Sequence, residues 1–136
     1  MTIDVELRVR YAETDQMGVA YYGSHFIWFE VARTEYCRAC GFRYAEMEKE
    51  TGLYMVVVEA TCRYRAPARY DDALVVRTAV SDLRRRLIRF RYTVFDKSSG
   101  RRVAEGETVH LLADRAGKTH PFPEAYFDIL RRTHSV

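Results

Sequence analysis

The residue best suited to chemistry is Asp15, which lies in a polar loop just before a stretch typical of a long helix. Gly18 and the pair Tyr22-Gly23 follow it. The first N–H groups of a helix have no internal partner and lie at the positive end of its dipole, so they can stabilise an oxyanion. A carboxylate beside them could activate water or attack a carbonyl directly. Asp15 is thus a candidate for acyl-transfer chemistry, although aspartate before a helix is also a common cap or turn residue.

A helix over residues 24–40 would position these groups. Its length, its charged positions and the glycine just past its end, Gly41, are typical of a helix. Its apolar residues cover more than one stripe, so we expect other elements to enclose most of it. A short second helix is expected over roughly residues 44–51, and an amphipathic tail over residues 124–132.

Strand patterns account for most of the remaining chain. Residues 3–10 alternate between apolar and charged, as a half-buried strand does. Four further strands are expected at 53–65, 74–80, 87–95 and 102–113, with turns at 67–72, 82–85 and 97–100. A strand, a long helix and then a four-stranded antiparallel meander predict an α+β fold in which the sheet curls around the helix. Such a sheet has open edges, and a homo-oligomer is expected because a second subunit can cover an edge.

Composition narrows the class of protein. The 136 residues, 48% of them hydrophobic, fit a single domain over 1–136. A formal charge of +3 is too small for a dedicated nucleic-acid binder, and no apolar run approaches the roughly 18 residues that span a bilayer. Three cysteines, an odd count, and the lack of a secretory leader favour a reduced, cytoplasmic protein. The histidines lack metal-ligand spacing.

Two segments resemble a known family. The stretch Tyr-Ala-Glu-Thr-Asp-Gln-Met-Gly-Val-Ala-Tyr-Tyr from Tyr11, continuing to Glu35, resembles the signature of the 4-hydroxybenzoyl-CoA thioesterase family. It is most similar to the branch of the Tol-Pal-associated acyl-CoA thioesterases. The segment from Arg63 to Asp72 resembles that family's strand-to-turn passage. The resemblance implies a hotdog fold, a curved antiparallel sheet around one long helix, assembled as a dimer or a dimer of dimers (a homotetramer). It also implies hydrolysis of an acyl-CoA to a carboxylic acid and coenzyme A without a metal or redox cofactor.

The same resemblance implies roles for individual residues. Asp15 would be the catalytic carboxylate, and Tyr22 would give its backbone N–H to the thioester carbonyl, with the amide of Gly23 beside it. Tyr11 would lie at the edge of the site, and Gly18 would keep the loop compact. The sequence departs from the family pattern at residues 23–25, where relatives often have Ala-Asn-Tyr, so the shape of the acyl pocket stays open.

Further substrate contacts are expected from His25 and from arginines. His25 stands at the start of the expected helix, close to the acyl pocket. Arginine binds phosphate well because its guanidinium is forked, so Arg63, Arg65 or the turn at 84–86 are candidates to hold the phosphates of coenzyme A. In the implied fold the site lies between subunits, so these arginines could come from the neighbour.

Three other functions compete with thioester hydrolysis. A hydratase or dehydratase of acyl thioesters would need a histidine paired with a carboxylate, for which only His25 is a candidate. A hotdog domain can also bind acyl-CoA without cleaving it, because a fold does not determine a function. The third alternative is a purely structural homo-oligomer, which coenzyme A would not stabilise.

Overall fold

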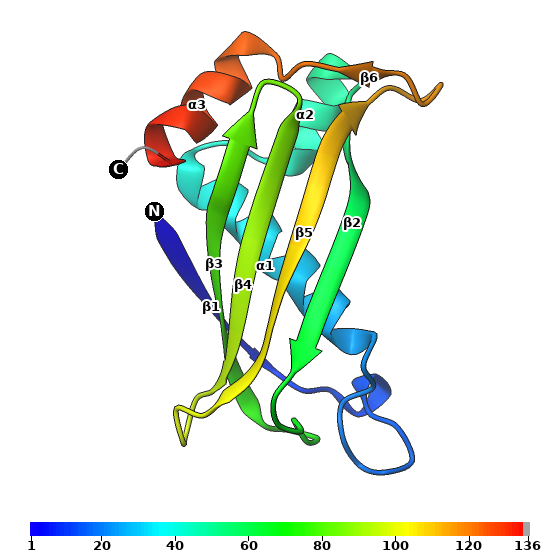
Figure 1. Cartoon of the computed structure of the whole chain (residues 1–136), viewed down its shortest axis with the longest axis vertical. Helices are drawn as coiled ribbons and strands as arrows, with labels where there is room; N and C mark the ends of the chain where they lie inside the picture. The colour runs from blue at the N-terminus through cyan, green and yellow to red at the C-terminus, as the bar shows by residue number, and fades with distance from the viewer. Residues whose placement is uncertain (135–136) are drawn as a thin grey trace.

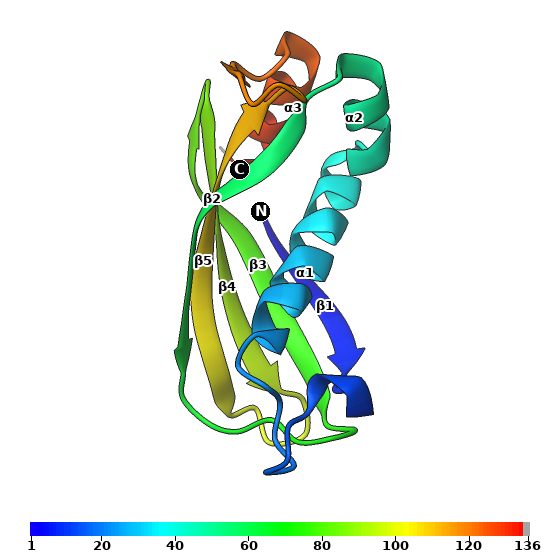
Figure 2. The same ribbon diagram turned by 90° about the vertical axis from the view of Figure 1, so that its right-hand side faces the viewer.

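One antiparallel sheet curves around a long helix in the computed structural model, which describes residues 1–134 (Figures 1 and 2). The helix, α1, spans Ser24–Cys40, and a 3-10 turn, η1, at Tyr11–Glu13 lies on the path to it. The strands are β1 (Thr2–Arg8), β2 (Tyr54–Tyr64), β3 (Ala73–Arg84), β4 (Leu87–Asp96), β5 (Arg102–Ala113) and the short β6 (Thr119–His120). Helices α2 (Tyr44–Thr51) and α3 (Glu124–His134) cover one end of the sheet. This confirms the predicted α+β class and the hotdog fold.

The predicted four-stranded meander is wrong, because β2 does not pair with β3. The strand order is β1-β3-β4-β5-β2, and β6 pairs with β5. Strand β3 is paired with β1 on one side and β4 on the other, so it has no free edge for β2. After β2 the chain crosses the end of the sheet to reach β3, and β2 pairs with β5 as the edge strand (Figure 1). The β3–β4 turn is also tighter than expected, because both strands extend into residues 82–87.

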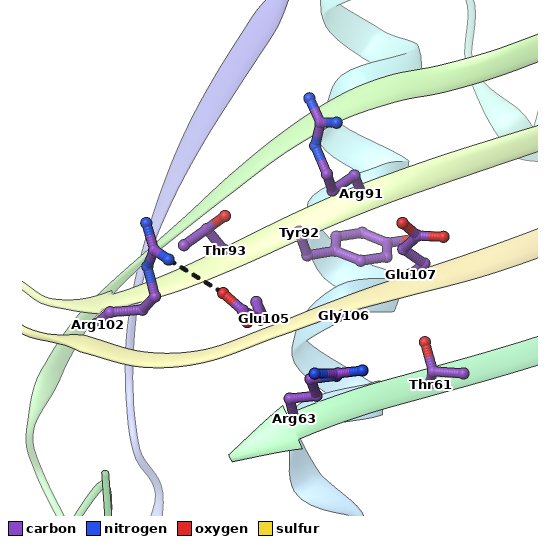
Figure 3. Close-up of a pocket in the computed structure, with 9 residues that line it drawn as sticks. All are labelled: Thr61, Arg63, Arg91, Tyr92, Thr93, Arg102, Glu105, Gly106 and Glu107. Atoms are coloured by element: carbon purple, nitrogen blue, oxygen red, sulfur yellow. Dashed lines mark hydrogen bonds and ion pairs between the residues drawn. The ribbon is translucent and has the colours of Figure 1, made fainter. Parts of the chain in front are cut away.

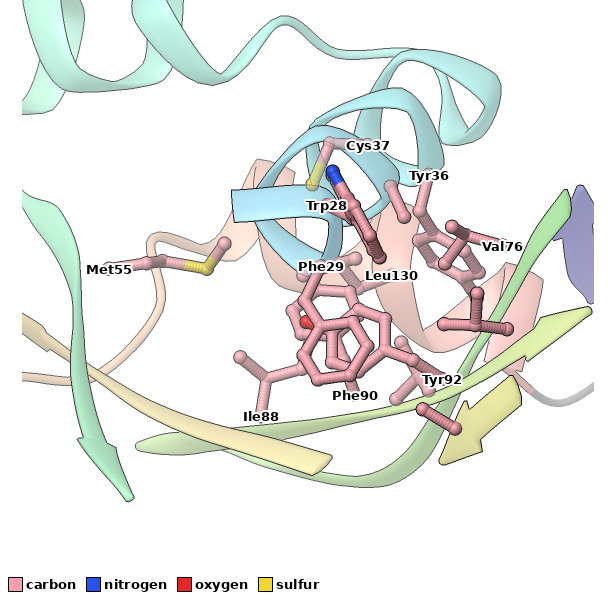
Figure 4. Packing of buried hydrophobic residues seen from close by; sticks show 14 of the residues in the cluster. Trp28, Phe29, Tyr36, Cys37, Met55, Val76, Ile88, Phe90, Tyr92 and Leu130 are labelled. Carbon is pink, nitrogen blue, oxygen red and sulfur yellow. The ribbon is translucent and has the colours of Figure 1, made fainter. Parts of the chain in front are cut away.

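The core lies between α1 and the concave face of the sheet (Figure 4). Phe29 of α1 stacks on Tyr92 of β4, with ring centroids 4.3 Å apart and an interplanar angle of 6°. Trp28 and Tyr36 extend the same buried surface along the helix. The helix is less enclosed than expected, since Ile27 is 50% and Val31 37% exposed on its other side. One apolar stripe of α1 is therefore left exposed.

Within residues 1–134, no helix combines the length and the apolar character needed to cross a membrane. Cys37, Cys40 and Cys62 are free thiols. Burial raises the pKa of Cys37 to about 12, so its thiolate form is strongly disfavoured at neutral pH. Cys37 and Cys40 have the Cys-x-x-Cys spacing of redox pairs, but this burial favours a packing role in the helix.

Candidate active site

The loop between β1 and α1 is held by a buried carboxylate, that of Glu13. Its side chain accepts a hydrogen bond of 2.8 Å from the backbone N–H of Arg10 and an ion pair of 3.1 Å from the Arg10 guanidinium. Its backbone carbonyl accepts from the amide of Tyr21 at 2.8 Å and from the hydroxyl of Ser24 at 2.9 Å. Glu13 thus connects the end of β1 to the first residue of α1, which fixes the loop between them.

Asp15 lies in this loop with its side chain exposed to solvent. One carboxylate oxygen, Oδ1, accepts from the amide of Met17 at 2.8 Å, and the Asp15 carbonyl accepts from Gly18 at 3.0 Å. Gly18 has a φ of +77°, a left-handed conformation that side chains disfavour, so glycine allows this tight turn. Within residues 1–134, no donor binds the second oxygen, Oδ2. The turn therefore orients the carboxylate and leaves one oxygen available.

Free backbone donors lie at the start of α1. The amide of Ser24 donates to Tyr21 at 2.9 Å, whereas those of Tyr22 and Gly23 donate to no acceptor in the described part of the chain. These two N–H groups lie directly before the helix, where its dipole favours negative charge. Free N–H groups in this position are suited to stabilise an oxyanion.

Tyr64, the last residue of β2, connects the sheet to these amides. Its hydroxyl donates to the carbonyl oxygen of Tyr22 at 2.8 Å, and its ring meets His25 edge-to-face at 5.0 Å. Burial raises the pKa of Tyr64 to about 12, so the phenol keeps its proton at neutral pH. The sequence reasoning did not single out Tyr64. Side chains alternate between the two faces of a strand, so an outward Arg63 would have predicted that Tyr64 lies on the inner face beside the helix.

These groups meet in one open cavity of about 400 Å³ at the N-terminal end of α1. Three of the residues expected in the site, Asp15, Tyr22 and His25, line it together with Arg65. The other lining residues are small or aromatic: Val19, Ala20, Tyr64, Ala66, Pro67 and Ala68. A carboxylate, amide donors and an apolar wall can together bind and polarise an acyl group.

Comparison with known proteins identifies the family. Residues 9–130 match the model of the thioesterase-like superfamily. The chain belongs to that superfamily. It is 38% identical over 84 residues to the acyl-CoA thioesterase YbgC of Haemophilus influenzae, covering 62% of each chain. The DHNA-CoA thioesterase of Staphylococcus aureus has a TM-score of 0.93 at 29% identity, over 98% of this chain and 91% of that one. A hypothetical protein of Thermus thermophilus has a TM-score of 0.91 at 35% identity, over 98% of both chains.

The remaining residues that the sequence predicted for the site do not line the cavity. Tyr11 is 78% exposed and packs edge-to-face on Tyr70, 5.9 Å away, beside the loop. Gly18 and Gly23 contribute backbone geometry and do not line the cavity. Arg63 points to the outer face of the sheet, because strand residues alternate and Tyr64 points inward. The turn at 84–86 lies at the opposite end of the sheet (Figure 1), where Arg85 pairs with Glu124 of α3 at 3.0 Å.

His25 is a buried, neutral residue at the back of the cavity. It is 3% exposed and packs against Trp28 with ring centroids 4.5 Å apart. Burial lowers its pKa to about 4, and its Nδ1 has no hydrogen-bond partner within residues 1–134. No described carboxylate is bonded to it, so His25 is not part of the histidine–carboxylate pair that a hydratase would require in this cavity. It forms part of the wall of the cavity.

Two buried histidines should make this superfamily member less stable in mild acid. Burial lowers the pKa of His25 and of His110 to about 4 each, from an ordinary 6.5. Both are neutral in the folded protein, whereas the unfolded chain binds their protons near pH 6.5. Their contribution is therefore complete above pH 6.5 and is lost as the pH falls toward 4, by up to about 1.4 kcal/mol per pH unit for each histidine.

Urea unfolding at pH 7.5, 6.5 and 5.5 should show this decrease, above the range where most carboxylates titrate. The imidazole C2 protons of both histidines should keep their neutral chemical shifts down to pH 5 by NMR. A free energy of unfolding that is flat from pH 7.5 to 5.5, or a titration of either ring near pH 6.5, would contradict the prediction.

Proposed function

We propose that the protein is an acyl-CoA thioesterase, which hydrolyses an acyl-CoA thioester to a free carboxylic acid and coenzyme A. The observation that carries this proposal is the cavity shared by Asp15 and Tyr22, where the amides of Tyr22 and the adjacent Gly23 are unpaired within residues 1–134. Membership in the thioesterase-like superfamily and the names of its relatives support the same reaction.

The reaction follows from the positions of these groups. The thioester oxygen would accept hydrogen bonds from the amides of Tyr22 and Gly23, which stabilise the negative charge as the carbonyl is attacked. Asp15 would take a proton from the attacking water, or attack the carbonyl itself to form an anhydride that water then opens. The C–S bond breaks and the thiolate of coenzyme A leaves and takes up a proton. This scheme assigns every step to the chain's own groups and the substrate, so we propose no metal or redox cofactor.

Tyr64 would position the oxyanion donors. Its hydrogen bond to the Tyr22 carbonyl holds the peptide group that carries the Gly23 N–H. A donor on the carbonyl also polarises the peptide, which strengthens its N–H as a donor. Tyr64 thereby acts on the reaction through another group, as a positioning residue.

Tyr64→Phe should therefore lower kcat about tenfold and leave KM within about twofold, since one hydrogen bond to the peptide is lost and the aromatic wall is kept. Steady-state kinetics with an acyl-CoA substrate would measure both constants. Tyr70→Phe is the matched control, because Tyr70 is an exposed tyrosine outside the cavity, and it should leave both constants unchanged. An unchanged kcat in Tyr64→Phe would remove Tyr64 from the mechanism.

The direct test of the activity is release of free thiol from a panel of acyl-CoA thioesters with short aliphatic, long aliphatic and aromatic acyl groups. Release from at least one class supports the proposal. No release from any of them, together with a higher melting temperature in coenzyme A, would instead indicate an acyl-CoA-binding module without catalysis.

We further propose that the protein forms a homo-oligomer through β2, as a dimer or as a homotetramer built from two dimers. Strand β2 is an open edge, and Val56, Val57 and Val58 on it are 39%, 49% and 54% exposed. The exposed stripe of α1, with Ile27 and Val31, offers a second apolar surface. Contact with a second copy would pair the free backbone N–H and C=O groups of this edge strand and would remove the exposed valines from water.

The remaining proposals concern the extent of the domain and its location. The whole chain, 1–136, would act as a single hotdog domain, because one core joins α1 to the sheet. The three free thiols fit a reducing cytoplasm. Arg65, which lines the cavity, would contact the substrate from the β2 side.

A further inference from the structure

A second cavity lies on the outer face of the sheet, separate from the site at the start of α1. It is a groove of about 540 Å³ that crosses β2, β5 and β4, and Figure 3 shows the charged side chains around it. In the strand pairing, Arg63 of β2 faces Glu105 of β5, and Arg91 of β4 faces Glu107 of β5. We name this cavity the outer groove, with Arg63 and Arg91 at its two diagonal corners.

The carboxylates of the outer groove are already neutralised. The Glu105 carboxylate accepts a hydrogen bond of 3.2 Å from Nε of Arg65 and another of 3.2 Å from Arg102. The dashed line in Figure 3 marks the bond from Arg102. The Arg65 guanidinium holds the pKa of Glu105 below its usual range. Glu107 forms an ion pair with Arg89 at 2.9 Å. These two glutamates therefore do not repel an incoming anion as free carboxylates would.

Arg63 and Arg91 have no such partner. Both are exposed, both line the outer groove, and neither forms an ion pair with any residue of 1–134. Together with the three paired arginines, they give this part of the sheet five positive and two negative charges. The two unpaired arginines therefore give the groove an excess of positive charge that favours an anion.

The spacing of the two arginines fits more than one phosphate group. They lie two strands apart and two residues out of register, so their Cβ atoms are roughly 12 Å apart by ordinary strand spacing. Two long side chains that extend over β5 can each bind a separate phosphate, bidentately, on one ligand. A single small anion would reach only one of them with good geometry.

We propose that the outer groove binds a nucleotide that carries two separated phosphate groups, with Arg63 and Arg91 as its phosphate contacts. The nucleotide end of coenzyme A is one source of this chemistry, and that part of the inference rests on the proposed thioesterase function. A free nucleotide bound apart from the reaction is the other source. The ion pair of Arg65 and Glu105 joins the two sites, because Arg65 lines the active-site cavity and Glu105 lines the outer groove.

Calorimetric titration with adenosine 3′,5′-bisphosphate tests the outer groove without any thioester. We expect binding by the wild type that weakens with added salt, and a Kd raised about tenfold or more in Arg63→Gln and in Arg91→Gln, since each removes a charge-assisted contact. The control is Arg115→Gln, which removes the same charge in the β5–β6 turn, away from the groove, and should bind like the wild type. Absence of binding, or equal weakening in all three variants, would overturn the proposal.

Kinetics then distinguish the two sources. If coenzyme A occupies the outer groove, Arg63→Gln and Arg91→Gln raise KM for an acyl-CoA and leave hydrolysis of the matching N-acetylcysteamine thioester unchanged. If KM stays constant while nucleotide binding is lost, the ligand is a free nucleotide. If the protein binds the bisphosphate but hydrolyses no thioester, the proposed nucleotide site is supported and the proposed thioesterase activity is contradicted. The two proposals can therefore fail separately.

Discussion

Asp15→Asn is expected to lower kcat for acyl-CoA hydrolysis by at least about a hundredfold, because within residues 1–134 it removes the only carboxylate that lines the cavity at the start of α1. The amide side chain has the same shape and can still accept the hydrogen bond from Met17, so the turn and the melting temperature should be preserved. Thiol release and thermal unfolding of the same samples measure the two effects.

Asp96→Asn is the matched control for this substitution. Asp96 also accepts a backbone hydrogen bond two residues on, from Ser98 at 2.9 Å, but in the hairpin between β4 and β5. It should cost some stability and leave kcat unchanged. Equal rates for wild type and Asp15→Asn would exclude Asp15 as base or nucleophile, and a collapse of stability would make it a structural turn residue.

Gly106→Ala should destabilise the fold by about 3 kcal/mol, at the upper end of the cost of overpacking a core. A Cβ at this position would lie 2.4 Å from the carbonyl oxygen of Thr61 and 2.6 Å from the ring of Phe29. The first contact is with the backbone of the paired strand β2, which cannot rotate away, and the second is with the ring that stacks on Tyr92. One methyl group therefore forces β2, β5 and α1 apart.

Urea denaturation measures this loss, with Thr93→Ala on the neighbouring strand as the control. Thr93 lies on the outer face, where truncation to alanine leaves no core void and should change the free energy of unfolding by less than about 0.5 kcal/mol. If Gly106→Ala changed the free energy of unfolding by an equally small amount, the sheet and the helix could separate at little cost. In that case the close approach at Gly106 would not limit the packing.

Local residue patterns were enough to predict most elements. The helix over Ser24–Cys40 and the short helix over Tyr44–Thr51 have the predicted bounds. Each ends at a glycine, and a glycine that ends a helix is a local signal that depends on only a few neighbouring residues. The fold class followed from element order together with the family signature. The placement of Asp15 near the free amides of Tyr22 and Gly23 was predictable for the same reason, since these residues are neighbours in the chain and one loop holds them.

Only the tertiary structure decided which distant segments meet. Strand pairing depends on which edge is free once β1 has paired with β3, so no local pattern could place β2 beside β5. Tyr64 contacts Tyr22, which is 42 positions away in the chain. Alternation along a strand puts Arg63 and Tyr64 on opposite faces, but only the position of the helix decides which of these faces is the inner one. The need for glycine at position 106 arises in the same way, because the atoms that exclude a side chain there come from β2 and α1. Sequence determined which candidate groups share one loop, while the contacts between elements depended on packing over the whole chain.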